Sequence, residues 1–179
     1  MAAPKKDITF AALKARYLEW AASQRRPQTI ESRERALDRF PLLTGIETVV
    51  RVQPDHVETF KRKYLEGAEP LQKPVGPRTV NEALGALRSV VYRAQRQKWY
   101  TGPNPFANVE MLPEPQRRPA WLTKEQIDTV LATAELHSRN AHLFFAQCLY
   151  AGMRKDEAIN ARWEWYDLDK VHISGAATL

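Results

Sequence analysis

Residues 149–159 read Leu-Tyr-Ala-Gly-Met-Arg-Lys-Asp-Glu-Ala-Ile, an arginine and two acidic residues directly behind an apolar run. The apolar run at 143–149 predicts a helix that is buried on all sides. We therefore expect Arg154, which follows Gly152, to be held partly inside the protein. A buried arginine is uncommon unless it is paired or binds an anion. The residues leave two interpretations open, a structural ion pair with Glu157 and a phosphate or carboxylate site.

Upstream of this stretch, the sequence predicts four helices within residues 1–100. Their expected spans are 7–24, 28–40 closed by Pro41, 54–65 and 78–98, each with apolar residues at three- and four-residue spacing. In the fourth helix, the apolar stripe consists of Val80, Leu84, Leu87 and Val91, and the opposite side carries Arg78, Arg93 and Arg96, with Arg88 at the border. The fourth helix thus has one stripe for a core and one for solvent or a ligand.

Proline density marks a boundary in the middle of the chain. Five prolines lie between residues 103 and 119, which predicts an extended linker over 101–119. The expected domains are therefore 1–100 and 120–179, joined by this linker. Because a strand at the end of the chain would leave an unpaired edge, we expect more chain to belong to the second domain.

The second domain has its own helix signals. Thr123 and Gln126 form a capping-box pattern ahead of a helix at 123–136. A longer helical stretch at 140–162 is expected to break or bend near Gly152, and residues 171–173 have strand character.

Charge and composition narrow the class of partner. Residues 1–118 hold 21 Lys and Arg against 13 Asp and Glu, whereas residues 119–179 hold 6 against 8. A basic first part favours a polyanionic partner. The four histidines lack metal-ligand spacing and the seven glycines are scattered, so neither a metal nor a cofactor is expected. No stretch approaches the roughly 20 apolar residues of a membrane span, so we expect no membrane partner.

The run 150–157, followed by Ala161-Arg-Trp163 and Tyr166-Asp-Leu-Asp169, resembles the first catalytic-arginine box of tyrosine recombinases, the phage-integrase family. The segment from Gly76-Pro-Arg-Thr79-Val-Asn81 to Asn104-Pro105 looks like the last long helix of that family's core-binding domain. The resemblance covers about residues 7–174.

This resemblance implies a mainly α protein. An N-terminal four-helix, SAM-like core-binding bundle would be followed by the truncated helical start of a mixed α+β catalytic domain. Members of the family recombine and integrate DNA through a 3′-phosphotyrosyl intermediate. By resemblance, Arg154 would stabilise the negative charge of the phosphoryl transition state, and Glu157 would orient that arginine.

The departures from the family pattern concern cleavage. No His-x-x-Arg box occurs in these 179 residues, and no tyrosine follows the sheet as a nucleophile would. We therefore expect this chain, by itself, to bind DNA and not to cleave it, as a fragment, a truncated gene product or an engineered piece would.

The expected partner is double-stranded DNA, gripped between the two domains. The candidate contacts, most of them to phosphates, are Arg25, Arg26, Arg78, Thr79, Arg88, Arg93, Arg96, Lys98, Arg117 and Arg118. The resemblance also implies that the full-length protein forms a homo-oligomer on DNA. It further implies a bacterial or phage-encoded protein that is cytoplasmic and associated with the nucleoid.

Two other functions fit the same residues. One is a helical DNA-binding regulator without any enzymatic role, in which Arg154 is purely structural. The other is an α-helical interaction module whose aromatic residues, such as Trp99-Tyr100 or Trp163 and Trp165, dock onto a protein partner.

Overall fold

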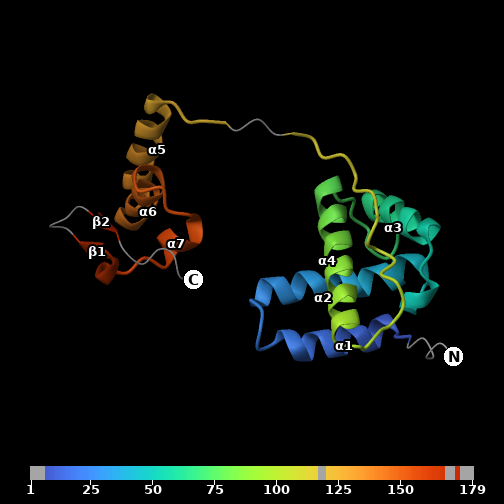
Figure 1. Ribbon diagram of the computed structural model, residues 1–179. Helices are drawn as coiled ribbons and strands as arrows, with labels where there is room; N and C mark the ends of the chain where they lie inside the picture. The colour runs from blue at the N-terminus through green and yellow to red at the C-terminus, as the bar shows by residue number, and fades with distance from the viewer. Residues whose placement is uncertain (1–6, 117–119, 168–171, 174–179) are drawn as a thin grey trace. The chain divides into compact units, whose positions relative to one another are not determined.

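A computed structural model describes residues 7–116, 120–167 and 172–173. It divides into two compact units, Met1–Gln116 (unit 1) and Arg117–Leu179 (unit 2). Unit 1 contains α1 (Phe10–Ala21), α2 (Pro27–Thr44), the short η1 (Val49–Arg51), α3 (Pro54–Glu66) and α4 (Pro77–Arg96) (Figure 1). Unit 2 contains α5 (Lys124–His137), α6 (Arg139–Tyr150), α7 (Lys155–Ile159), η2 (Trp163–Trp165), β1 (Tyr166–Asp167) and β2 (His172–Ile173). The fold is mainly α, as the sequence predicts.

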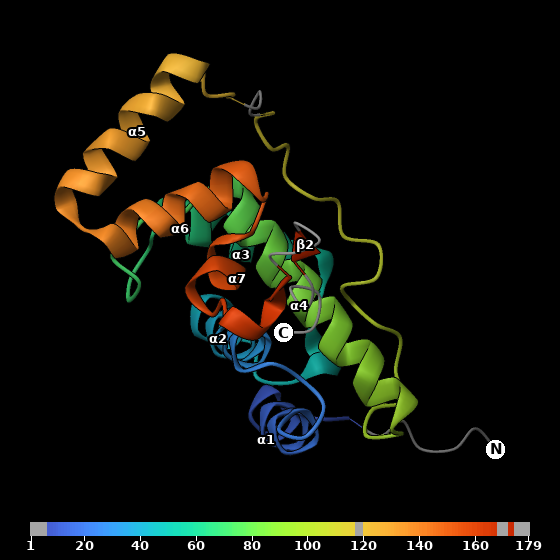
Figure 2. The same ribbon diagram turned by 90° about the vertical axis from the view of Figure 1, so that its left-hand side faces the viewer.

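The core of unit 1 forms where α4 crosses α1 and α2. Those two helices lie side by side, and Figure 2 looks nearly along them. Phe40 of α2 is the centre, because its ring lies 5.2 Å from Phe10, 5.2 Å from Phe60 and 5.1 Å from Phe106, centroid to centroid. The predicted apolar stripe of α4 is fully buried: Val80, Leu84, Leu87 and Val91. The expected four-helix bundle is confirmed.

Helix α2 is longer than its sequence predicts. Pro41 lies inside the helix instead of closing it, and the helix runs on to Thr44. Gly45 ends it in the left-handed conformation, with φ of 73°, and donates its N–H to the carbonyl of Pro41 at 2.8 Å. Pro41 has no N–H, so the helix lacks one backbone hydrogen bond there. Burial of Phe40 and Leu43, on either side of the proline, stabilises the last turn in spite of this loss.

The predicted linker at 101–119 needs correction, because residues 101–116 belong to unit 1. The segment runs beside α4, and Phe106 is fully buried. Three polar side chains of α4 bind its backbone: Gln95 donates to the carbonyl of Gly102, Arg88 to those of Phe106 and Val109, and Asn81 to that of Leu112. The first domain therefore extends past residue 100 to Gln116. Residues 117–119 lie outside the described part.

Unit 2 begins with two helices, α5 and α6, whose start and break lie close to the positions that the sequence predicts. Thr123 caps α5 by accepting the N–H of Gln126, which in turn accepts the N–H of Thr123. Gly152, with φ of 65°, breaks the helical stretch into α6 and α7, as expected. After η2, β1 and β2 pair antiparallel, with Tyr166 opposite Ile173.

The expectation that α6 is buried on all sides is wrong. No residue of α6 is fully buried, and Leu143 and Phe145 are 42% and 40% exposed. The reason is that, within the described part of unit 2, only α5 and α7 pack closely against it. No helix among the described residues is long and apolar enough to cross a membrane.

Candidate nucleic-acid interface

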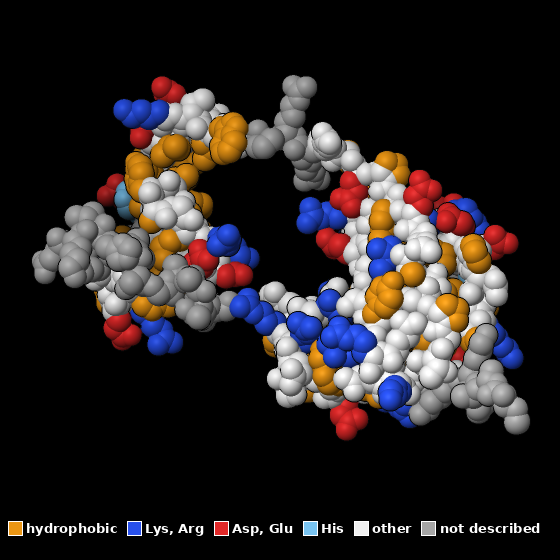
Figure 3. All heavy atoms as spheres, in the orientation of Figure 1, with side chains coloured by type: hydrophobic (Ala, Val, Ile, Leu, Met, Phe, Trp, Pro, Cys, Tyr) orange, Lys and Arg blue, Asp and Glu red, His pale blue; other side chains and the backbone are white. Residues whose placement is uncertain are grey.

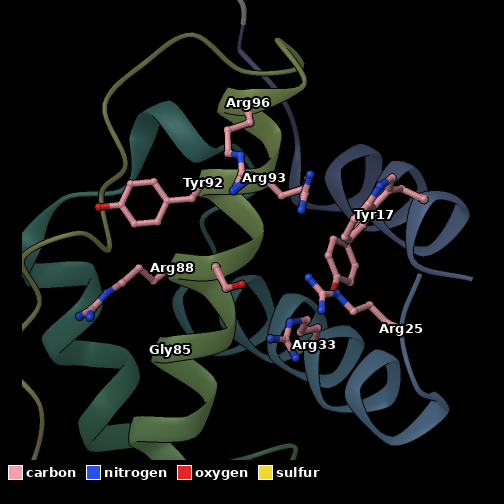
Figure 4. A pocket seen from close by; sticks show the side chains of 10 residues that line it. Tyr17, Arg25, Arg33, Gly85, Arg88, Tyr92, Arg93 and Arg96 are labelled. Carbon is pink, nitrogen blue, oxygen red and sulfur yellow. The ribbon is translucent and has the colours of Figure 1, made fainter. Parts of the chain in front are cut away.

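Five arginines line a hollow of about 340 Å³ between α1, α2 and α4 of unit 1 (Figure 4). Its lining residues come from three helices and the turn after α1: Tyr17, Trp20, Arg25, Arg33, Gly85, Arg88, Ser89, Tyr92, Arg93 and Arg96. Half of them are arginines and none is acidic. The packing of α2 against α4 brings together arginines that are about 60 residues apart in the sequence. We call this site the arginine hollow.

Four of the five arginines are available to an anion. Within the described part of the chain, Arg25, Arg33, Arg93 and Arg96 form no ion pair with a carboxylate. Arg33 makes one long hydrogen bond, at 3.4 Å, to the carbonyl of Thr29. Guanidinium groups without acidic partners suit phosphate oxygens, which accept two parallel N–H bonds from one fork.

Arg88 differs from the other four because its guanidinium group is already used. Its Nε donates to the carbonyl of Phe106 at 2.8 Å and its Nη2 to that of Val109 at 3.2 Å. Figure 4 shows its side chain pointing away from Arg25 and Arg33. The sequence predicts Arg88 as a DNA contact, whereas its observed bonds hold the 101–116 segment on α4.

Trp20 forms part of the aromatic wall of the hollow, with Tyr17 at 5.7 Å between ring centroids. The Cζ of Arg93 lies 3.9 Å from the centroid of Trp20, and that of Arg25 lies 5.5 Å away. One indole ring therefore contacts two cations, Arg25 from the turn after α1 and Arg93 from the last turns of α4.

Arg78 and Thr79 lie at the opposite end of α4. Eighteen residues separate Arg78 from Arg96, or about 27 Å along a helix axis. Arg78 binds Glu82 at 3.0 Å, and this hydrogen bond, with the charges of Glu82 and Glu114, raises the pKa of the guanidinium above its usual value. The sequence groups these residues with the basic stripe, but the structure keeps them apart from the hollow.

Four predicted DNA contacts remain, and two of them lie in the described part of the chain. Arg26 and Lys98 are exposed, and Lys98 follows α4 with φ of 56°. Arg117 and Arg118 lie outside the described residues. Whether any of the ten predicted residues contacts DNA stays a prediction.

Charge separates along unit 1. Figure 3 shows Lys and Arg side chains gathered on its lower part, toward the C-terminal end of α4 that carries Arg93 and Arg96, whereas acidic side chains lie on the upper part. Two acidic residues bind side chains near the start of α4: Glu82 accepts from Arg78, and Glu114 accepts from Asn81. On the face that Figure 3 shows, most basic side chains of unit 1 therefore lie toward the C-terminal end of α4.

Sequence reasoning missed six residues of the hollow: Tyr17, Trp20, Arg33, Gly85, Ser89 and Tyr92. Tyr17 and Trp20 belong to the apolar spacing of α1, which by itself is typical of a core-facing stripe. Tyr17 is buried, whereas Trp20 is half-buried. Arg33 belongs to α2, whose contact with α4 has no local signal in the sequence. A tryptophan close to Arg25 and Arg26 was the one available hint.

The arginine box of unit 2 is a tight local structure. Glu157 accepts the backbone N–H of Arg154 at 2.8 Å and its Nη1 at 3.1 Å. These two bonds lower the pKa of the Glu157 carboxyl below its ordinary value. The side chain of Arg154 is 86% exposed, so the expectation that it is partly buried is wrong. It lies at the surface because α6, which precedes it, is itself only partly covered.

Unit 2 has a second hollow, of about 680 Å³, between α6, α7 and the start of β1. Leu143, Phe144 and Ile159 give it a largely apolar wall. Among the described residues no cluster of His, Cys, Asp or Glu could hold a metal ion. The arginine hollow is thus the stronger candidate for binding an anion.

No protein-family model matches the sequence, and no curated protein matches it. A solved structure does: the crystal structure of a lambda integrase dimer bound to a COC′ core site superposes on 97% of this chain, with a TM-score of 0.72 and 13% sequence identity. The chain has the fold of a tyrosine recombinase. It spans 47% of the length of that integrase. The fold expected from the arginine box is thereby confirmed, over nearly the whole chain.

Proposed function

We propose that this chain binds double-stranded DNA through the arginine hollow, as the DNA-binding part of a site-specific tyrosine recombinase. One observation carries the proposal: four arginines that have no carboxylate partner within residues 7–116, 120–167 and 172–173 converge from three elements on a hollow whose lining has no acidic residue. The likeness in fold to an integrase bound to DNA supports it.

The mode of binding follows from the chemistry of the hollow. Guanidinium forks and the hydroxyls of Ser89 and Tyr92 recognise phosphate oxygens, which are the same in every DNA sequence. Binding is therefore governed by the DNA backbone and weakened by salt. Contacts from unit 2, including Arg117 and Arg118, would add to it.

Cleavage is not part of the proposal for these 179 residues. Arg154, supported by Glu157, corresponds by resemblance to one phosphate-stabilising arginine, and its exposed guanidinium suits that role. The sequence holds no His-x-x-Arg box to supply a second one. We therefore infer binding without strand breakage.

Fluorescence anisotropy of a labelled duplex at low salt tests the proposal. Arg33→Ala and Arg93→Ala should each weaken binding several-fold, and by the same factor on two duplexes of unrelated sequence, because phosphate contacts carry no sequence information. Arg62→Ala is the matched control, since Arg62 is an exposed arginine of unit 1 that is paired with Glu66.

Wild-type protein without affinity for either duplex would refute DNA binding and leave the protein-interaction module as the better hypothesis. Equal losses in Arg62→Ala and Arg93→Ala would refute the hollow as the site. Nicked or covalently attached DNA in the same reactions would refute binding without cleavage.

A further inference from the structure

Trp20 has no charge, but its ring contacts two arginines of the arginine hollow. Its ring carries Arg93 at 3.9 Å and Arg25 at 5.5 Å, from guanidinium carbon to ring centroid. Arg93 comes from the last turns of α4, and Arg25 from the turn that follows α1. The indole thus contacts one arginine from each of these two elements.

Contact with the ring changes what these guanidinium groups can do. A guanidinium group over the face of an aromatic ring is attracted to the ring and keeps N–H donors that can bind a ligand. It also loses rotamer freedom before any ligand arrives, so binding a phosphate orders it less. Neither arginine has a carboxylate partner among the described residues that would satisfy those donors.

We propose that Trp20 is a positioning residue of the DNA interface, whose ring holds Arg93 and Arg25 in the orientation that meets the phosphate oxygens of a DNA backbone. This inference rests on the proposed function of the hollow. Trp20 acts through the two arginines and adds no charge, so removing it leaves the number of cations unchanged.

A purely structural role is the competing explanation, because Trp20 is half-buried and also packs against the core of unit 1. Trp99 provides the matched control. It is another half-buried tryptophan packed against the same core, and it does not line the hollow. A loss of binding caused by weakened packing alone should appear in both Trp20→Leu and Trp99→Leu.

A double-mutant cycle on the full chain tests the inference, with anisotropy of a labelled duplex as the readout. Trp20→Leu should weaken binding about three- to tenfold, and Arg93→Ala should cost less in the Trp20→Leu background than in the wild type. Trp20→Phe, which keeps a ring and carries less risk to folding, should stay within about twofold of the wild type. Trp99→Leu should have little effect on affinity.

The possible failures are distinguishable. If the wild type binds DNA and Arg93→Ala weakens it, but the two substitutions combine additively, the positioning role is wrong and the proposed function stands. Equal losses in Trp20→Leu and Trp99→Leu, or in Trp20→Leu and Trp20→Phe, also refute it. If the wild type does not bind, both proposals fail.

Discussion

Arg88 is a basic residue on the helix that carries Arg93 and Arg96, but its side chain stabilises the fold. Its two hydrogen bonds to the carbonyls of Phe106 and Val109 hold an irregular segment that carries a buried aromatic ring. Arg93 and Arg96, five and eight residues further along α4, line the hollow and have no carboxylate partner in the described part of the chain. Residue type alone therefore does not separate a structural arginine from one that can bind a ligand.

Arg88→Ala should lower the free energy of unfolding by about 2–3 kcal/mol, because two carbonyls lose a charged donor. Urea denaturation followed by circular dichroism measures this. Arg96→Ala, an exposed change on the same helix, should stay within about 0.5 kcal/mol of the wild type. Equal stabilities of the two variants would contradict the structural role of Arg88.

The lowered pKa of Glu157 predicts how its contribution to stability depends on pH. Its pKa is lowered because the carboxylate accepts the backbone N–H and the guanidinium of Arg154. The stabilisation that it contributes is therefore present above the ordinary glutamate pKa, and it is lost as pH falls through the lowered value. NMR titration of the side-chain carboxyl should give a midpoint below the ordinary one.

Arg154→Ala is the control for that titration. It removes the guanidinium and keeps the backbone N–H, so the midpoint should move only part of the way back. A wild-type midpoint at the ordinary glutamate value would contradict the observed geometry.

At the scale of elements, α4 organises unit 1 on two sides. Its apolar stripe enters the core, and Asn81, Arg88 and Gln95 bind the extended 101–116 segment. These three residues are spaced by seven, so they fall on one face of the helix. The proline-rich segment is thus a strap along α4 that three side chains hold, with a turn at 105–108.

Asn81→Ala should release the far end of this segment. Asn81 accepts the N–H of Leu112 at 2.9 Å and donates to its carbonyl at 2.9 Å. Hydrogen exchange at the Leu112 amide should accelerate, with about 1–3 kcal/mol lost in protection. Ser89→Ala, on the same helix and exposed, should leave it unchanged. An unaltered rate in Asn81→Ala would contradict the described contact.

The helices that sequence predicts well are those with strong local signals. The capping box at Thr123, the glycine break at Gly152 and the apolar stripe of α4 each need only neighbouring residues. Pro41 misled because burial of the residues around it outweighs its local preference. The course of 101–116 depends on contacts with residues up to 31 positions away, although Phe106 among the prolines is the sign that was available.

At the scale of the whole molecule, the two units differ in how much core they have. Unit 1 buries a continuous cluster centred on Phe40. In the described part of unit 2, the buried hydrophobic residues are Leu131, Ala134, Met153 and Ala158. The unit that carries the arginine hollow is therefore the one with the firmer scaffold, which suits a site that must be held in shape.

Calorimetry should show this difference as two unfolding transitions, with unit 2 unfolding at the lower temperature. Leu84→Ala, in the core of unit 1, should cost about 2–5 kcal/mol and lower only the upper transition. Duplex DNA bound at the hollow should raise that same transition. A single transition that responds to both changes would contradict two independently folded units.

The arginine hollow itself lay largely beyond sequence reasoning. Arg25, Arg93 and Arg96 were predicted as contacts, but their meeting with Arg33 and Trp20 depends on how α2 crosses α4. Arg78 was predicted from the same basic stripe, and it lies about 27 Å from Arg96 along the helix axis. A basic stripe predicts the kind of ligand better than it predicts the site.

The salt dependence of duplex binding tests the central claim most directly. The account predicts that log K falls linearly with log salt, and that each arginine removed from the hollow reduces the steepness by about 0.9. Arg33→Ala combined with Arg93→Ala should therefore flatten the slope by about 1.8, and Arg62→Ala should not change it. Affinity that does not depend on salt, or a slope that the double variant leaves unchanged, would contradict a phosphate-binding arginine hollow.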